Sequence, residues 1–585
     1  MIKSSTAADT EGNLNPFDLM ALAKIASQGL TRLVDLERKG LTYFIGEWRA
    51  NPPRAVHNFW DYGDGSGRLL DALTLCAIMS KPDLESKKAT TLIEDWVLRQ
   101  FGADGLSWVP NEPWAKPWGD DALFVHPVLD GEFCEVSWSQ RGSLMGMLSK
   151  YLSTADSRYL EKAKRHVDGL LNIAVKHVDG LYFPDVYYQN VGWQTLRHDI
   201  DPVMVEYNAA ILPALVRLYE VTKYEPAREL AIGITNFALL HTKGYGPNGE
   251  FLVPEGNLSS HFHTRSNFVL GVLKLGIVEE IKEHIAWAKY SYDQLRNLGT
   301  DFGWFPEAIG GRHGELCCTT DMIEIALLLG QHVERNYFAD VERYGRNHLI
   351  ESQWRSLPRL LSAVSKLKPP PSEESEFPDY FTLDNVPERQ IGAFCSRPAL
   401  NDGFHLDATA LMQCCNGAGA RALYDLWRYA IEVSETETPV KISINLRMSV
   451  ETPLMRVVSH EPAKGMLEVT PKIDCNVHIR VPEGTDSALL RVPGNAEQNL
   501  KAVDGYVNFS ARSDELVQIQ YTLQERQVEY RVGSNGREDI VQGFWRGETL
   551  MKVDPPGSFY PFYLRDDDIA LVLPALASGK AIDSI

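Results

Sequence analysis

The chain of 585 residues has few cysteines, no long apolar run and a shortage of basic residues. It contains 8 Cys, and no apolar run reaches the length of about eighteen residues that a membrane-spanning helix needs. Lys and Arg total 58 against 78 Asp and Glu, which gives a formal net charge of −20. Nucleic acids and anionic membrane surfaces attract clustered basic side chains, so this balance argues against both as partners.

The first residues, MIKSSTAADTEGNLNPF, lack an apolar core of signal-peptide length. We therefore expect a cytoplasmic protein, in which thiols are metal ligands or catalytic groups more often than disulfides. Adjacent cysteines are also poorly placed to pair with each other, because a disulfide needs particular Cβ directions. A homo-oligomer is compatible with this composition.

The spacing of apolar residues divides the chain into two parts. In the first part, up to about residue 435, the spacing is helical, and in DSRYLEKAKRHVDGLL Asp156 is the expected cap. Further helices are expected at 69–79, 89–101, 142–152, 208–219, 228–240, 267–298 and 320–332. No strands alternate with these helices, which argues against a parallel βαβ fold and favours a toroid of paired helices.

In the second part, from about residue 436, the period changes to two. The segments VKISINLRM, CNVHIRV and VQIQYTL alternate apolar with polar residues, and turn sequences such as VPEG, VPGN and VDG separate them. We predict a mainly α protein with a C-terminal β part, in which residues 1–435 form the helical catalytic domain and residues 436–585 an antiparallel β-sandwich.

Two pairs of adjacent cysteines each lead into a helical pattern. Cys317 and Cys318 occur in GELCCTTDM, and Cys414 and Cys415 occur in LMQCCNGAGA. A thiol at a helix N-terminus is stabilised as the thiolate, the form that binds metals and attacks carbon. Glu315 adds a carboxylate, and one carboxylate with three thiolates would satisfy a tetrahedral zinc ion. The alternative is that the cysteines are small buried hydrophobic residues.

A glutamate and two polar helix entries are further candidates. Glu307, in DFGWFPEAIGG, is a candidate general acid, because flanking Trp304 and Phe305 would exclude water and raise its pKa. The alternative for Glu307 is an ordinary loop carboxylate. Two motifs are candidate sugar-binding sites. In HNFWDYGDG, Trp60 offers a stacking face and Asp61 and Asp64 offer hydroxyl acceptors, and in HFHTRSNF, His261, His263 and Arg265 suit sugar hydroxyls or a carboxylate. Asp64 has the alternative role of a helix cap, and His198 is expected to be structural.

These motifs resemble the β-L-arabinofuranosidases of glycoside hydrolase family 127, over most of the chain. The resemblance is carried by FWDYGDGSGRLLDAL, HFHTRSNF, GWFPE, ELC, QCCNGAGARALY, VKISINLRMSVETP and WRGETLMKVDPPG. Its most specific element is E-x-C followed, about a hundred residues later, by a vicinal Cys-Cys. No common fold needs that order for stability. The resemblance implies an (α/α)6 barrel followed by β-sandwich material.

The resemblance also implies a cofactor, a substrate class and residue roles. It implies zinc held by Glu315, Cys317, Cys414 and Cys415, with Cys414 as the nucleophile of a retaining glycosidase and Glu307 as the acid/base. The implied partner is a carbohydrate, either a small oligosaccharide or a glycoside. Three departures from the family pattern are a short stretch between Glu307 and Glu315, the extra thiol of Cys318, and Met412 and Gln413 where the family has a sugar-contacting His.

Two other functions use the same features differently. A polysaccharide lyase or sugar epimerase on the same toroid would rely on His261 or His263 with Tyr207 for acid/base chemistry, and its thiols would be incidental. A non-catalytic carbohydrate-binding protein would keep the helical domain without the chemistry.

Overall fold

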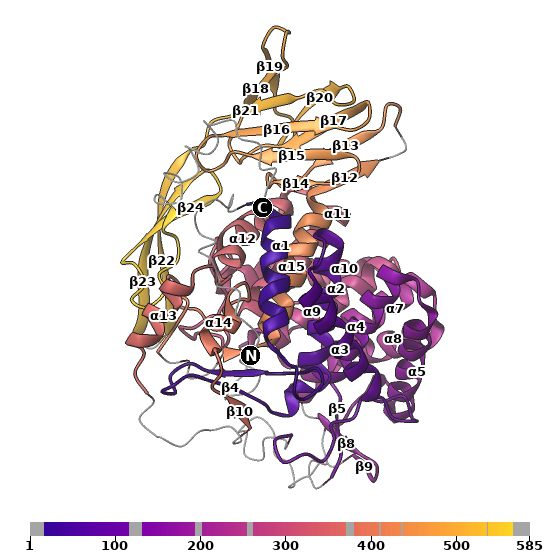
Figure 1. The fold of residues 1–585 in the computed structure, drawn as a ribbon. Helices are drawn as coiled ribbons and strands as arrows, with labels where there is room; N and C mark the ends of the chain where they lie inside the picture. Colours follow the sequence, from indigo (N-terminus) through magenta and orange to yellow (C-terminus); the bar gives the residue numbers. More distant parts are fainter. Residues whose placement is uncertain are drawn as a thin grey trace.

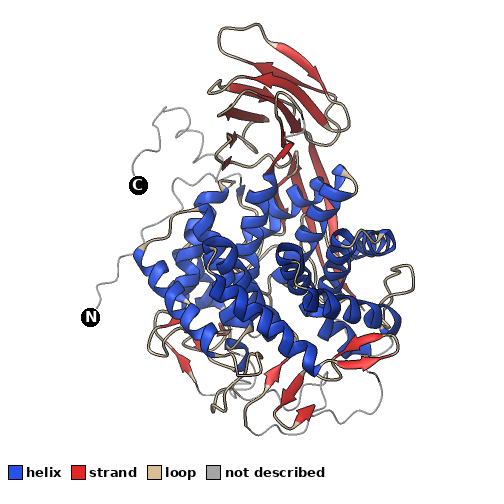
Figure 2. Cartoon of the chain, turned by 90° about the vertical axis from the view of Figure 1, so that its right-hand side faces the viewer, coloured by secondary structure: helices blue, strands red, loops and turns tan. Residues whose placement is uncertain are grey.

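The long helices lie in the first part of the chain and the larger sheets follow them, in the order that the sequence predicts (Figure 1). The structure is a computed structural model that describes residues 17–115, 131–193, 200, 202–253, 261–369, 380–406, 408, 411–434, 437–534 and 536–565. Figure 2 shows the helices gathered in one body, with C-terminal strands at one end and along one side and small sheets at the other end. Among the described residues, no helix has the length and apolar character needed to cross a membrane.

Within the described chain, six helices contact one another in a closed order that returns to its start. They are α2 (Asp64–Met79), α4 (Trp138–Thr154), α7 (Leu212–Thr222), α9 (Phe262–Val278), α11 (Leu316–His332) and α15 (Cys414–Ala430). Packed outside them are α1 (Leu19–Arg32), α3 (Leu84–Arg99), α5 (Ser157–Ile173), α8 (Glu225–His241), α10 (Lys282–Leu295) and α12 (Phe338–Tyr344). The shorter helices are α6 (Pro202–Asn208), α13 (Leu357–Lys366) and α14 (Val386–Gln390).

Local sequence signals account for several helix ends. The carboxylate of Asp156 caps α5 by accepting a hydrogen bond of 3.0 Å from the backbone N–H of Arg158, as predicted. The single helix predicted at 267–298 is wrong. The chain breaks after α9, with Glu280 in the left-handed region at φ 57°, and α10 folds back against α9. Apolar periodicity continues through this break because both helices bury a face on their common interface.

Glycines let α2 approach two neighbouring helices closely. A Cβ on Gly67 would lie 2.2 Å from the carbonyl carbon of Gly142 in α4, and a Cβ on Gly417 in α15 would lie 2.9 Å from the Cβ of Arg68. Only glycine fits such separations. The first turn of α2 is therefore held beside the first turn of α15, which begins at Cys414.

Short strands that the sequence did not indicate form four small sheets in the helical part. They are β1 (Val34–Asp35) with β2 (Leu41–Thr42), β6 (Val175–His177) with β7 (Gly180–Tyr182), β5 (Cys134–Glu135) with β8 (Tyr187–Gln189) and β9 (Gly192–Trp193), and the order β10 (Phe381–Thr382), β4 (Arg54–Val56), β3 (Ile45–Glu47), β11 (Leu411–Met412). Strands of two or three residues are too short to produce a visible alternation. The pairing of β11 with β3 fixes the chain immediately before Cys414.

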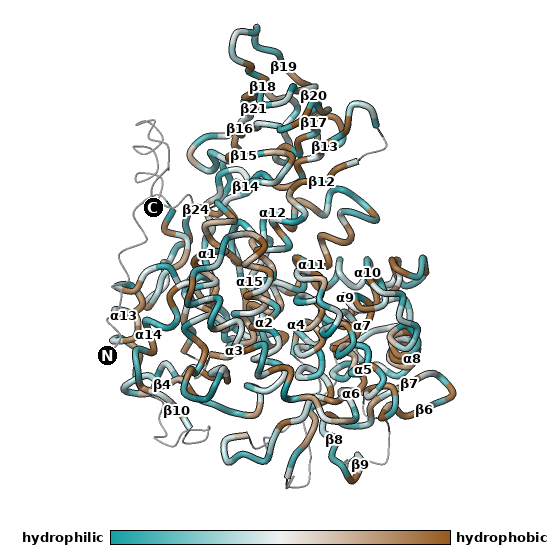
Figure 3. Tube along the Cα trace, turned by 45° about the vertical axis from the view of Figure 1, so that its right-hand side comes forward, coloured by the Kyte–Doolittle hydropathy of each residue, from teal (hydrophilic) through white to brown (hydrophobic). Residues whose placement is uncertain are grey.

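The C-terminal part contains three sheets, and hydrophobic stretches run through its strands as well as through the helices (Figure 3). A four-stranded sheet has the order β12 (Ile431–Ser434), β13 (Lys441–Ile444), β17 (Cys475–Arg480), β20 (Tyr506–Ala511). A six-stranded sheet has the order β14 (Val450–Glu451), β15 (Met455–Ser459), β16 (Met466–Pro471), β21 (Val517–Gln520), β18 (Ser487–Arg491), β19 (Gln498–Lys501). The third sheet is β22 (Glu525–Ser534), β23 (Arg537–Arg546) and β24 (Thr549–Asp554).

The expectation of purely antiparallel sheets needs one correction. Strand β13 pairs in parallel with β17, because the chain between them crosses to the six-stranded sheet through β14, β15 and β16. Strand β13 also ends at Ile444, earlier than the alternation in VKISINLRM indicates. The residues after it include Arg447, whose side chain is buried in a network of charges.

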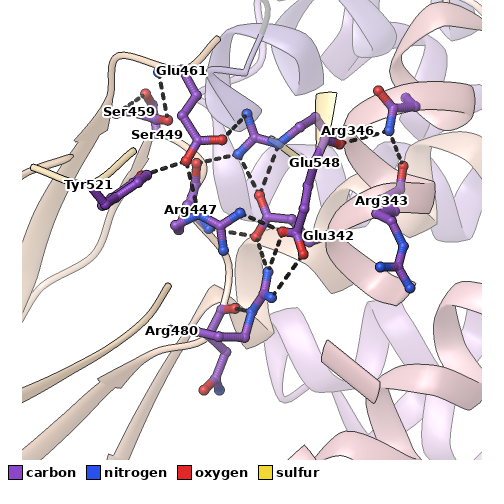
Figure 4. A network of polar contacts seen from close by, with 12 residues as sticks. Glu342, Arg343, Arg346, Arg447, Ser449, Ser459, Glu461, Arg480, Tyr521 and Glu548 are labelled. Carbon is purple, nitrogen blue, oxygen red and sulfur yellow. Dashed lines mark hydrogen bonds and ion pairs between the residues drawn. The ribbon is translucent and has the colours of Figure 1, made fainter. Parts of the chain in front are cut away.

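That network joins the helical part to the C-terminal sheets (Figure 4). Arg447 donates from Nε to Glu461 at 2.9 Å and from its backbone N–H to Glu342 of α12 at 2.7 Å. Arg480 of β17 also reaches Glu342, at 3.0 Å, and Glu548 pairs with both arginines. These side chains are almost completely buried, so each charge depends on its partners in the network for stabilisation.

Candidate metal and catalytic site

The two cysteine-bearing helix ends meet. Helix α11 begins at Leu316 and α15 begins at Cys414. The helices start slightly earlier than the sequence indicated, so the thiols lie inside their first turns. The Sγ atom of Cys317 lies 3.4 Å from that of Cys415 and 3.9 Å from that of Cys414. The four cysteines of the two pairs are buried, and Cys414, with 8 % exposed, is more accessible than its neighbour Cys415.

Glu315 completes a four-residue donor set. It occupies the N-cap position of α11, and its carboxylate and the sulfurs of Cys317, Cys414 and Cys415 all lie within 4.8 Å of one another. Zinc–sulfur bonds of about 2.3 Å in a tetrahedron imply sulfur–sulfur separations of about 3.8 Å. The observed separations are close to that value, so these donors fit a tetrahedral zinc ion.

Cys318 lies outside this donor set. Its Sγ is 3.7 Å from the carbonyl oxygen of Pro306 and 3.7 Å from Glu315 Oε2. Burial, with Glu315 nearby, raises its pKa well above the ordinary thiol value. The second adjacent pair in the sequence therefore contributes one thiol to the cluster, Cys317.

The protein environment favours one thiolate in the cluster, on Cys414. Hydrogen bonds from the thiols of Cys317 and Cys415 lower the pKa of Cys414 well below its usual value, against the effect of burial. The nearby charges of Arg68 and His263 act in the same direction. Burial raises the pKa of Cys317 and of Cys415. The most accessible sulfur is thus also the one whose negative charge is best stabilised.

Two predicted histidines border the cluster. His261 Nε2 lies 2.8 Å from Glu315 Oε2, and its side chain is 31 % exposed. Burial alone would raise the pKa of Glu315, but His261 and then His263 hold it at about 2. His263 Nδ1 bonds Asp321 at 2.6 Å and its ring stacks on Trp138 at 4.5 Å. His263 Nε2 is buried and has no hydrogen-bond partner among the described residues.

On another side, Asp64 and Arg68 approach the thiols from α2. Arg68 Nε donates to Asp64 Oδ1 at 2.6 Å, and Arg68 Nη1 lies 3.7 Å from Cys317 Sγ. Burial raises the pKa of Asp64 to about 7. The N-cap of α2 is Gly63 and the carboxylate of Asp64 accepts from Arg68, so the alternative role of Asp64 as a helix cap is wrong. Arg68 was not singled out from the sequence, although its i, i+4 spacing from Asp64 indicates a pair on one helix face.

Glu307 lies near the cluster but in a different environment from the one expected. Its carboxylate pairs with Arg397 and accepts a hydrogen bond of 2.7 Å from His313 Nε2. Burial would raise its pKa, but Arg397 and His313 lower it overall, so the expected raised pKa is wrong. The physical reason is that Trp304 and Phe305 are fully buried in the protein interior, while charged groups surround the carboxylate. The ligand atoms of His261, Glu307 and Glu315 lie within 4.8 Å of one another.

Three predicted sugar-binding residues have structural surroundings. Asp61 is fully buried and accepts hydrogen bonds from the backbone N–H of Phe44 at 2.9 Å and from His57 at 2.6 Å. Arg265 is fully buried against Glu206 at 2.8 Å. Trp60 is 8 % exposed and packs on Phe59 at 4.4 Å. These partners hold the three side chains in the protein interior, and their role as sugar contacts stays a prediction.

Tyr207, the candidate base of the alternative reading, lies edge-on to Trp138 at 5.8 Å. Burial raises its pKa well above the ordinary value, which disfavours the tyrosinate. His198 lies outside the described residues.

A hairpin from the C-terminal part supports the loop that carries Glu307. Ser534, at the end of β22, donates from Oγ to the carbonyl oxygen of Gly310 at 3.2 Å. Asp539 of β23 lies 3.5 Å from Arg312 and 3.4 Å from His405. This contact could not be predicted from the sequence, because the two segments are more than two hundred residues apart.

Comparisons with known proteins agree with this architecture at the level of the fold. No family model and no curated protein matches the chain. Among solved structures, a family 127 β-L-arabinofuranosidase from Geobacillus stearothermophilus T6 superposes with a TM-score of 0.52 and 12% identity, covering 91% of this chain and 80% of that one. Another family 127 β-arabinofuranosidase gives a TM-score of 0.56 at 13% identity, covering 91% of this chain and 81% of its own.

A third structure, described as a glycoside hydrolase, has a TM-score of 0.52 at 12% identity and covers 88% of this chain and 84% of that one. At such identities the likeness establishes the fold. The resemblance to family 127 seen in the sequence is therefore accompanied by a likeness of fold to solved family 127 structures.

Proposed function

We propose that this chain is a zinc-dependent retaining glycoside hydrolase with Cys414 as its nucleophile. The observation that carries the proposal is the convergence of Glu315, Cys317, Cys414 and Cys415, from two helix N-termini, within 4.8 Å of one another. The fold, shared with solved family 127 structures, supports the same conclusion. The proposed substrate is a small oligosaccharide or glycoside, with a β-L-arabinofuranoside as the first candidate.

The closed order of helix contacts supports an (α/α)6 barrel as the catalytic domain, within residues 1–435, followed by β-sandwich material in residues 436–585. In this arrangement α2, α9, α11 and α15 present their N-terminal ends to the same site, with Asp64, His261, Cys317 and Cys414 at those ends. Helix N-termini stabilise negative charge, which suits a site built from thiolates and carboxylates.

Four residues would hold the metal, namely Glu315, Cys317, Cys414 and Cys415. When bound, zinc would keep the sulfurs deprotonated at neutral pH. Arg68, which is buried beside Cys317, would stabilise the negative charge of the thiolates. His261 orients the carboxylate of Glu315, the one oxygen ligand, through their hydrogen bond.

In the proposed first step, Cys414 Sγ attacks the anomeric carbon and forms a carbon–sulfur bond while the glycosidic carbon–oxygen bond breaks. The leaving oxygen needs a proton. We propose that the pair of His313 and Glu307 donates it, from the proton shared between His313 Nε2 and Glu307 Oε2. Glu307 needs this partner because Arg397 lowers its pKa and favours the carboxylate. The product of this step is a thioglycosyl enzyme and a free alcohol.

In the second step, water attacks the anomeric carbon and the carbon–sulfur bond breaks. Glu307, as a carboxylate, accepts the proton of that water, which restores the His313–Glu307 pair. Two displacements at one carbon retain the anomeric configuration. His261 and His263 are the proposed contacts to sugar hydroxyls, since His261 is partly exposed and His263 Nε2 is buried without a partner among the described residues.

Replacing Cys414 by Ser tests the proposal. We expect Cys414→Ser to abolish hydrolysis of aryl glycosides, including both anomers of arabinofuranoside, because serine is not held as an oxyanion at neutral pH. Zinc content, measured on the purified protein, should be about one per chain in the wild type and should fall in Cys317→Ser and Cys415→Ser. Cys318→Ser is the matched control and should retain both zinc and activity, because its sulfur lies outside the donor set.

If Cys414→Ser hydrolysed every substrate of the wild type at the wild-type rate, the cysteine mechanism would be wrong. A protein that contains no zinc would point to the lyase or epimerase alternative, in which His261, His263 and Tyr207 carry the chemistry. A zinc-containing protein that cleaves no glycoside would point to a carbohydrate-binding relative.

A further inference from the structure

The hairpin of β6 and β7 is held tightly against α8, away from the residues of the thiol cluster. Its turn residue Gly180 has φ +147°, and a Cβ there would lie 2.3 Å from the carbonyl oxygen of Gly233 and 3.1 Å from the backbone nitrogen of Phe237. Only glycine allows this approach. The turn is therefore fixed beside the last turns of α8, which ends at His241.

This contact brings together two histidines and an aspartate. Asp179 Oδ2 lies 2.9 Å from His241 Nε2 and 3.4 Å from His177 Nδ1, and one donor atom from each residue lies within 4.8 Å of the others. Phe237 fixes both imidazoles, because its ring stacks on His241 at 4.3 Å and meets His177 edge-on at 5.4 Å. The group is thus preorganised from two elements.

The nitrogen of His177 that faces Asp179 already accepts a hydrogen bond. The backbone N–H of Asp179 donates to His177 Nδ1 at 3.2 Å, so a metal bound at Nδ1 would replace this hydrogen bond. The side chains are partly exposed, at 33 % for His177, 33 % for Asp179 and 24 % for His241, so water has access to a further coordination position. The C-terminal end of α8 favours positive charge there.

We propose that His177, Asp179 and His241 form a second zinc site that joins the β6–β7 hairpin to α8. Zinc bonds of about 2.0–2.1 Å in a tetrahedron imply donor separations of about 3.3 Å, close to the 2.9 Å and 3.4 Å observed. Two imidazoles and one carboxylate suit zinc and its neighbours in the first transition series, and do not suit calcium or magnesium. The proposal is independent of the thiol cluster and of the proposed hydrolase activity.

Cobalt(II) is the probe for this site, because it replaces zinc and reports its ligands. In the full-length wild type, a first equivalent bound by the thiol cluster should give thiolate-to-cobalt charge-transfer absorption. Further cobalt should bind with heat measurable by calorimetry and without added charge-transfer absorption. If the charge-transfer absorption were absent while cobalt still bound with measurable heat, the proposed zinc–thiolate centre would be wrong and the hairpin site would still stand.

The variant that tests the hairpin site is His177→Asn with His241→Asn. We expect it to weaken the second binding event by at least about tenfold, while the charge-transfer absorption stays at the wild-type level. His332→Asn is the matched control, because His332 also ends a helix and belongs to no group of donors found in the described residues. The proposal is overturned if the double variant binds this second class of cobalt like the wild type, or if the wild type binds no cobalt beyond that which gives charge-transfer absorption.

Discussion

Arg68 has an electrostatic role that follows from the composition of the donor set. One carboxylate and three thiolates around a doubly charged zinc ion would leave an excess of two negative charges in a buried site. Such an excess requires positive charge nearby. Arg68 supplies it, because its guanidinium is buried, is held by Asp64 and lies 3.7 Å from Cys317 Sγ.

Replacing Arg68 by Met should therefore weaken zinc binding by about 10–100-fold, the usual effect of removing a group that supports metal ligands. Arg68→Lys keeps the charge and should lose less affinity. Chelator competition on the purified protein measures both changes without reference to activity. Arg421→Met is the control, since Arg421 joins α15 to α2 through Asp71 at 2.7 Å and should leave zinc affinity unchanged. Equal zinc affinities of Arg68→Met and the wild type would contradict this role.

At the residue scale, the sequence predicted the members of the proposed donor set better than the surroundings of the other candidate residues. Glu315, Cys317, Cys414 and Cys415 belong to a short, unusual pattern, and the structure brings all four together. The surroundings of Glu307 could not be predicted, because Arg397 reaches it from a distant loop and reverses the direction of its pKa shift. Likewise, no pattern in HNFWDYGDG distinguishes a sugar contact from a buried structural carboxylate such as Asp61.

At the scale of elements, the β22–β23 hairpin links the C-terminal part to the proposed chemistry. Its residues contact the loop of Glu307 through Ser534 to Gly310 and through Asp539 to Arg312. Asp539 also lies 3.4 Å from His405, whose ring centroid is 6.0 Å from that of His313. The hairpin therefore positions the His313–Glu307 pair, the proposed proton donor, without contributing a group to the reaction itself.

Asp539→Ala should lower kcat on the order of tenfold, because a displacement of about 1 Å at a catalytic group can cost up to about 100-fold. KM should change less than kcat, and zinc content should stay at the wild-type value, since the donor set is untouched. Steady-state kinetics with metal analysis measures all three. Glu538→Gln is the control on the same strand, where Glu538 lies 3.7 Å from the exposed Arg531. An unchanged kcat in Asp539→Ala would show that the hairpin does not position Glu307.

Element types followed from periodicity, whereas their ends and partners followed from tertiary packing. The change from helix to strand is visible in the sequence, but it occurs where α15 ends at Ala430 and β12 begins, a few residues before the predicted position of about 436. The break between α9 and α10 was not visible, because both helices are apolar where they face each other. The strand predicted at 440–448 was too long, because β13 ends at Ile444. Arg447 occupies a polar position of the alternating pattern, but its side chain is buried in the charge network and does not face solvent from a strand.

At the scale of the whole molecule, the C-terminal sheets are fixed to the helices by buried charge. Helix α15 has 17 residues, so its strand-bearing end lies about 25 Å from Cys414. At that end Arg447 pairs with Glu461 at 2.9 Å and with Glu548 at 2.5 Å, and all three are buried (Figure 4). Burial would raise the pKa of Glu548, but Arg480 and Arg447 lower it far below its ordinary value, so the carboxylate stays ionised.

Arg447→Met should lower the free energy of unfolding by about 3–5 kcal/mol, because it leaves buried carboxylates without their cation. Denaturant unfolding at neutral pH, followed by both far-UV circular dichroism and tryptophan fluorescence, measures the change. Arg531→Met is the matched control, since Arg531 pairs with Glu529 at 2.8 Å on an exposed strand and should cost about 1 kcal/mol or less. The zinc content of folded Arg447→Met should equal that of the wild type, because the network and the donor set occupy opposite ends of α15. A loss of zinc at full stability would instead mean that the network supports the metal centre directly.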